Sequence, residues 1–155
     1  MVWAKDKLVA QLNRLTEVCI DAEEGYQQAA EQIEDFELTA LLADCARGRT
    51  AMADELQNMV QALGGDPVIR GTASGRLRRK WLRVKKTLAK QSNVSILCDC
   101  RQGEEVVAEE FRRALEQPLP AEQDAVVRRQ FSTIVATCER LKSLEQSLKS
   151  KSVDR

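Results

Sequence analysis

Apolar residues spaced three and four positions apart run through most of this chain, and this spacing limits what it can fold into. The first stripe consists of Leu8, Leu12, Leu15, Cys19, Ala22, Tyr26, Ala29 and Ile33. The second consists of Leu38, Leu42, Cys45, Arg49, Met52, Leu56, Met59 and Leu63. Such spacing keeps one face of a long helix against a partner. The first 64 residues therefore predict two long helices with a break at residues 34–36, and one arginine on an apolar stripe.

The second half of the chain predicts two more long helices. Gly64 and Gly65 stop the second helix, and a glycine-containing connection follows. Ser92 or Asn93 can cap a third long helix that runs to about residue 117, and Pro120 can open the last one. Their stripes consist of Leu97, Cys100, Glu104, Val107, Phe111 and Ala114, then Val127, Phe131, Ile134, Cys138, Leu141, Leu144 and Leu148.

Helices of 25 to 30 residues span roughly 40 Å, so the four stripes can pair along their full length. We therefore expect an all-α fold, a four-helix bundle made of two antiparallel helix hairpins. The single domain covers residues 1–155, with the first hairpin at about 4–64 and the second at about 92–150. The connection at about 65–91 includes a short basic helix near residues 75–89.

The two hairpins share a sequence frame. CIDAEE at residues 19–24 and CRQGEE at residues 100–105 both read C-x-x-x-E-E and lie 81 positions apart. The same offset matches Glu23 to Glu104 and Val60 to Leu141. This internal two-fold of hairpins is the organisation of ferritin-like bundles.

The chain also resembles a known family through LNRLTEVCIDAEEGYQQAAE, ELQNMVQALGG, RRKWLRVK, CRQGEEVVAEEFRRAL and RRQFSTIVATCERL. These segments are similar to a bacterial family of small ferritin-like four-helix-bundle proteins of unknown function, within the ferritin and rubrerythrin superfamily. The resemblance covers nearly all of residues 8–148 and implies a ferritin-like bundle, self-association and no established activity. The chain departs from the family pattern at Arg78 and Cys138, where histidine is common, and it contains no histidine at all.

Two inward carboxylates raise the question of a metal centre. In ferritin-like bundles a dinuclear site takes a Glu from the first helix of each hairpin and a Glu-x-x-His pair from each second helix. Glu23 flanks its stripe and Glu104 lies on its own, so both could point inward. A metal site would use Glu23 and Glu104 with Glu55 or Cys138 as supporting ligands, and it would bind iron or manganese.

The alternative that we favour is an ion pair. Counted from the turn, the residues of the second helix that face Glu23 are the cations Arg47 to Arg49. Glu23 and Glu104 would then be balanced by Arg49, Arg47 or Arg128, in pairs that fix the packing of the helices. A third alternative places these carboxylates in solvent or at an interface.

The cysteines and the basic segment have simpler interpretations. Four of the five cysteines fall on apolar stripes, where cysteine commonly packs as a small hydrophobe, and Cys98 is the most reachable. Nine Lys or Arg and no acidic residue lie between Arg70 and Lys90, which leaves the rest of the chain with a net charge of −9. We expect residues 76–90 to cap the acidic body of the bundle rather than bind nucleic acid or membrane.

Together these observations predict a non-catalytic structural or interaction module. The start of the chain does not read as a secretory signal, and no stretch is apolar enough to span a membrane, so we expect a cytoplasmic protein. No catalytic residue and no cofactor are predicted, apart from iron or manganese under the metal alternative. The expected partner is another protein, first of all a second copy of the chain, through apolar surface around Val2, Trp3 and Phe36.

Overall fold

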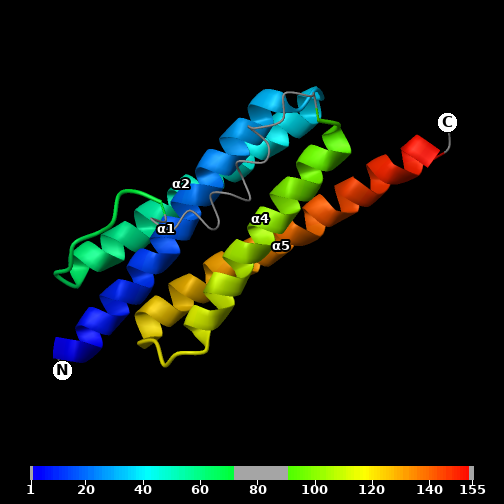
Figure 1. The fold of residues 1–155 in the computed structure, drawn as a ribbon. Helices are drawn as coiled ribbons and strands as arrows, with labels where there is room; N and C mark the ends of the chain where they lie inside the picture. Colours follow the sequence, from blue (N-terminus) through cyan, green and yellow to red (C-terminus); the bar gives the residue numbers. More distant parts are fainter. Residues whose placement is uncertain (1, 72–90, 154–155) are drawn as a thin grey trace.

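The computed structural model describes residues 2–71 and 91–153, and it describes side chains from residue 4 to 71 and from 91 to 151. Within these ranges the chain forms α1 (Val2–Gln32), α2 (Phe36–Ala62), α4 (Asn93–Leu115) and α5 (Ala121–Val153), and no strand. Figure 1 shows the four helices in two antiparallel hairpins. The predicted all-α bundle is confirmed. The predicted basic helix near 75–89 lies outside the described residues.

The helix ends follow from local sequence. The Asp35 side chain accepts a hydrogen bond from the Leu38 amide at 2.9 Å and so caps α2, and Ser92 caps α4 in the same way. At the other end of α2, Gly64 takes a φ of +80°, a left-handed conformation that favours glycine. The helices therefore begin and end within a few residues of the predicted bounds.

The apolar stripes meet in one core along the bundle axis. Each helix contributes side chains with no exposed surface, for example Leu12, Leu42, Leu97 and Ile134. α1 packs against both α2 and α4, and α5 packs on α4, whereas α2 and α5 make few contacts with each other. None of the helices, over the part of the chain that the structure describes, has an apolar stretch long enough to cross a bilayer.

Residues 64–71 fold back along the first hairpin. The Asn13 side chain on α1 donates to the Asp66 carbonyl at 3.0 Å and accepts from the Val68 amide at 3.1 Å. From α2, the Gln57 amide donates to the Val68 carbonyl at 2.8 Å. These three bonds fasten the start of the connection to both helices of the hairpin.

Asp21 on α1 is buried beneath the start of the connection. The side chain is 2% exposed and lies against the backbone of Gly71. A β-carbon at position 71 would overlap the Asp21 carboxylate, so the close approach requires glycine there. Sequence spacing could not show that the connection covers this part of α1.

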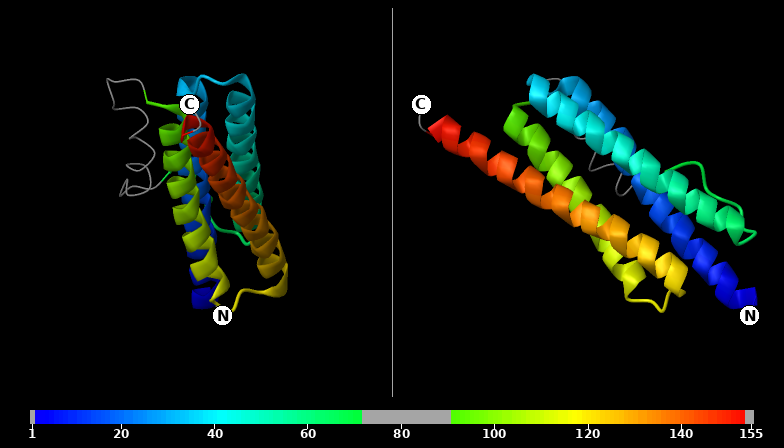
Figure 2. Two further views of the ribbon diagram at one scale, coloured as in Figure 1. Left: turned by 90° about the vertical axis from the view of Figure 1, so that its right-hand side faces the viewer. Right: turned by 180° about the vertical axis from the view of Figure 1, so that it is seen from behind.

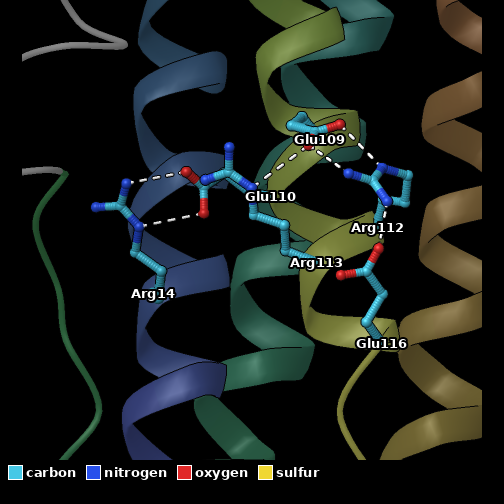
Figure 3. Close-up of polar contacts among 6 residues, drawn as sticks. All are labelled: Arg14, Glu109, Glu110, Arg112, Arg113 and Glu116. Carbon is cyan, nitrogen blue, oxygen red and sulfur yellow. Dashed lines mark hydrogen bonds and ion pairs between the residues drawn. The ribbon is translucent and has the colours of Figure 1, made fainter.

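Surface ion pairs support the contact between the hairpins. In Figure 3 the guanidinium of Arg14 on α1 faces the carboxylate of Glu110 on α4, with nitrogen–oxygen distances of 3.0 and 3.4 Å. Along α4, Arg112 pairs with Glu109 and Glu116. Exposed pairs of this kind contribute roughly 0 to 1 kcal/mol each, so we treat them as orienting contacts and not as the main source of stability.

Candidate functional site

The centre of the bundle contains polar groups from all four helices. Tyr26 comes from α1, Arg49 from α2, Glu104 from α4 and Thr137 from α5. We call these four residues the central cluster. Tyr26 and Glu104 have no exposed surface and Arg49 is 1% exposed. A polar cluster so deep in an apolar core costs stability unless its members satisfy one another.

The contacts within the central cluster meet that requirement. Arg49 Nη2 lies 2.7 Å from Glu104 Oε1, and Arg49 Nε donates to the same oxygen at 2.9 Å. The Tyr26 hydroxyl donates to Glu104 Oε2. Arg49 Nη2 also donates to Thr137 Oγ1 at 3.2 Å. Both oxygens of the buried carboxylate are therefore engaged by donors from two other helices.

The side chain of Arg49 explains why an arginine lies on an apolar stripe. Its long stem crosses the core from α2 to α4, two helices that lie diagonally opposite in the bundle. On the way its guanidinium carbon passes 5.9 Å from the centroid of the Tyr26 ring, within the range of a cation–π contact. Of the ion pairs that the sequence left open, the one between Glu104 and Arg49 is present, and it links the two hairpins through the core. The expectation that Glu23 faces Arg47 to Arg49 is wrong, because Glu23 accepts a hydrogen bond from Gln27 on its own helix.

Burial raises the pKa values of both acidic groups in the cluster, Glu104 and Tyr26. Burial raises the pKa of Glu104, although the charge of Arg49 and the Tyr26 hydroxyl both stabilise its ionised form. Burial also raises the pKa of Tyr26 well above its usual value, and the Glu104 charge adds to the rise. The tyrosine therefore remains a hydrogen-bond donor, and the Arg49–Glu104 pair leaves the core without net charge.

The structure does not bring Glu23 and Glu55 into this cluster. Glu23 is half-buried at the edge of α1 and accepts a hydrogen bond from Gln27 Nε2 at 2.6 Å. Burial raises the pKa of Glu23. Glu55 lies between α2 and α5, where it pairs with Arg129 and accepts from Gln130 Nε2 at 2.8 Å. Each of these carboxylates has local partners of its own.

Cys138 and the two remaining candidate arginines also lie outside the cluster. Cys138 follows Thr137 on α5 and is half-buried. Arg47 and Arg128 pair with acidic residues on their own helices, Asp44 and Asp124. Over the described ranges, no three or more side chains of cysteine, aspartate or glutamate are arranged to hold a metal ion.

The thiols near the cluster are poor ligands and poor nucleophiles at neutral pH. Burial raises the pKa of Cys19 and of Cys138 to about 12, and that of Cys45 to about 11. Burial also raises the pKa of Cys100, which has no exposed surface, well above its usual value. Metal binding and nucleophilic attack both require the thiolate, so burial disfavours both at these cysteines. Their interpretation as packing residues stays a prediction.

A family model described as a domain of unknown function, DUF2383, matches residues 7–117 of the chain. The match covers more than two thirds of the sequence. The chain belongs to the DUF2383 family. No curated protein matches it.

Solved structures show which fold this DUF2383 protein has. A conserved hypothetical protein of Mycobacterium tuberculosis is 16% identical, with a TM-score of 0.71 over 91% of this chain and 97% of that one. A ferritin-like, diiron-carboxylate protein of Bacillus anthracis is 17% identical, with a TM-score of 0.68 over 93% and 96%. A two-domain protein of Anabaena variabilis, with DJ-1/ThiJ/PfpI-like and ferritin-like domains, matches 94% of this chain with 38% of its own, at 14% identity and a TM-score of 0.75. The fold is ferritin-like.

A dinuclear carboxylate centre does not fit the donor set of this DUF2383 protein. The cation of Arg49 is paired with Glu104, and both oxygens of that carboxylate already accept hydrogen bonds.

Tyr26 and Thr137 are the cluster members that sequence reasoning missed. A tyrosine on the stripe was the available signal, because a buried hydroxyl needs a polar partner, but its spacing did not identify Glu104 as that partner.

Proposed function

We propose that this protein is a non-catalytic helical module that acts through contact with other proteins. The observation that carries the proposal is the full engagement of the Glu104 carboxylate by Arg49 and Tyr26. In a ferritin-like scaffold this core position is suited to a metal-bridging carboxylate. Here a cation of the chain itself neutralises it. The five free thiols suit a reducing compartment, and we place the protein in the cytoplasm.

Metal analysis of protein purified without added chelator tests the proposal. We expect iron, manganese and zinc each well below one ion per chain, because Arg49 repels cations and imidazole ligands are absent. A matched set consists of Glu104→Ala, which removes the core carboxylate, and Glu105→Ala, which removes its exposed neighbour. Two ions per chain that are lost in Glu104→Ala and retained in Glu105→Ala would refute the proposal.

The second candidate is a carboxylate-bridged iron or manganese protein. It is favoured by the fold shared with a Bacillus anthracis protein described as a diiron-carboxylate protein. Under this alternative Glu23 and Glu104 would be ligands, supported by Glu55 or Cys138. Added Mn²⁺ or Fe²⁺ would then raise the melting temperature, since a ligand at 100 times its Kd stabilises the folded state by about 2.7 kcal/mol. Our proposal expects no change.

A further inference from the structure

The contact between α2 and α5 differs from the other contacts of the bundle. It is much the smallest among the neighbouring helix pairs, although both helices are long. The contact is made where Glu55, in the second half of α2, meets Arg129 and Gln130 in the first half of α5, and the long side chain of Arg49 also reaches Thr137. Both views of Figure 2 show the helices diverging from there toward the C-terminal end of α5.

The diverging halves present a surface of small and apolar side chains that are only half-buried. This α2–α5 face consists of Leu41, Cys45 and Gly48 on α2 and Thr137 and Leu144 on α5. Helical spacing places the three α2 residues on the same side as Met52 and Glu55, which α5 contacts further along. A β-carbon added at Gly48 would meet no neighbouring atom within 4 Å, so the space beside α2 is open there.

Charges of opposite sign border the α2–α5 face on its two sides. Glu37 and Asp44 lie along α2, where Asp44 also pairs with Arg47 of the same helix, whereas Arg140 and Lys151 lie along α5, and all of these residues are exposed. With every charged residue of the two segments counted, residues 37–48 have a net negative charge and residues 137–151 a net positive charge. A partner that was only acidic or only basic would be repelled by one of these sides, whereas a surface of the same kind, turned by 180°, matches both.

We propose that the α2–α5 face binds a second copy of this chain in a two-fold symmetric dimer. In this arrangement α5 of each copy lies against α2 of the other, which is the isologous pairing that sets the basic side of one copy against the acidic side of its partner. Arg140 then lies opposite Asp44 of the partner subunit, once on each side of the axis. Leu41 and Leu144 lose their remaining contact with water between the paired helices. The inference rests on the proposed function and names the partner for it.

The size of the face sets the strength of the dimer. Residues 37–48 and 137–151 give the face a length of about 20 Å at 1.5 Å per residue. Two helices, each about 10 Å across with its side chains, make it about 20 Å wide where they lie closest. Such a face covers about 400 Å² on each copy, or about 800 Å² in total, which is smaller than most stable interfaces and typical of weak, transient ones. We therefore expect a weak dimer that forms toward the upper end of the concentrations tested below.

The bundle ends are a different surface and serve as the comparison. Phe36 is 89% exposed, and the sequence interpretation grouped it with Val2 and Trp3. The backbone of Val2 and Phe36 lies at opposite ends of α1, about 45 Å apart for 31 residues. These residues therefore do not form one surface, and the side chains of Val2 and Trp3 lie outside the described residues.

Sedimentation equilibrium of the full chain from 1 to 200 µM tests the dimer. The buffer contains a chelator and a reducing agent, so neither metal nor a disulfide between chains can contribute. We expect a monomer–dimer equilibrium that Arg140→Glu weakens at least tenfold and that Asp44→Lys weakens to a similar extent. The double variant Asp44→Lys/Arg140→Glu restores it, because the pair is reversed and not removed. Glu139→Lys, an exposed charge change beside Arg140, is the matched control and leaves the dimer unchanged.

Three results would overturn the inference. The first is a monomer at every concentration. The second is a dimer whose dissociation constant is unchanged in both Arg140→Glu and Asp44→Lys. The third is a dimer that is lost in Phe36→Ser but retained in Arg140→Glu. Restoration in the double variant separates a lost interface from a misfolded chain. Sedimentation tests the dimer and metal analysis tests the proposed function, so the two can fail separately. A metal-binding protein could still dimerise, and a metal-free protein could be monomeric.

Discussion

Removing one member of the buried ion pair should cost more than removing both. Glu104→Gln leaves the charge of Arg49 in a core where the side chain is 2% exposed. Breaking a buried pair in this way typically costs 3 to 5 kcal/mol, so we expect a loss of about 3 kcal/mol in the free energy of unfolding. For a chain of this size that loss corresponds to about 6 to 12 °C in melting temperature.

The double variant Arg49→Met/Glu104→Gln decides whether the pair is coupled. Methionine fills much of the space of the arginine stem, and the glutamine can still accept a hydrogen bond from Tyr26. We expect each single variant, Glu104→Gln and Arg49→Met, to lose about 3 kcal/mol and the double variant to lose less than either, whereas two independent losses would sum to about 6 kcal/mol. Urea unfolding followed by circular dichroism gives the free energy of unfolding of the native protein, the two single variants and the double variant. Arg47→Met, at an exposed pair on the same helix, is the control and should change stability by less than about 0.5 kcal/mol.

The pH dependence of Arg49→Met provides a second readout. Without the arginine, burial raises the Glu104 pKa further. A carboxyl with a raised pKa in the folded state favours folding when protonated, so the variant loses stability as the pH rises from about 4.5 through that raised value. Its deficit against the native protein should therefore be larger at pH 8 than at pH 5. Additive single losses, or a deficit that is the same at both pH values, would refute the coupling.

Asn13→Ala removes two of the bonds that fasten residues 64–71 and should cost about 1 to 2 kcal/mol, measured by urea unfolding. Arg101 holds the pKa of Glu145 below its usual value through a hydrogen bond, and this stabilisation is present above about pH 4.5 and lost as the pH falls. Arg101→Gln should therefore flatten the loss of stability between pH 5 and pH 3, and an unchanged slope would contradict this. In the native protein Cys98, which is half-buried, should react with a thiol reagent well before the fully buried Cys100, as mass spectrometry of labelled peptides can check. Equal labelling rates would show that the core opens as readily as the surface.

The bundle could be predicted from the sequence because each stripe specifies its own helix. Arg49 also stood out, since a cation on an apolar stripe needs a buried anion, and the stripe of the second hairpin contained Glu104. The pairing between them could be expected but not distinguished from pairs with Arg47 or Arg128. Spacing along one helix does not show how far a side chain reaches across the core, and only the structure shows that reach.

The matched frames around Glu23 and Glu104 mark the limit of such prediction. Both glutamates follow a buried cysteine by four residues, and both cysteines have no exposed surface. Glu104 is nevertheless buried, whereas Glu23 is half-buried at the border of the buried face of α1. On α1 the buried arc continues through Ala22 to Tyr26 and leaves Glu23 at its border. A rotation of a helix by a few tens of degrees separates these outcomes, and equal spacing cannot reveal it.

Under the proposed function, this broken symmetry lets the charges of the core balance one another without a metal. Two inward carboxylates close together would repel each other and would need cations or protons between them. Because Glu23 faces its neighbour Gln27 and not the core, Glu104 is the one carboxylate in the cluster, and one guanidinium balances its charge. The aromatic ring and hydroxyl of Tyr26 occupy the remaining side of the carboxylate. Turning this centre into a metal site would therefore require at least three coordinated changes, namely loss of Arg49, an inward second carboxylate and nitrogen ligands, and each of the first two alone would leave an unbalanced charge in the core.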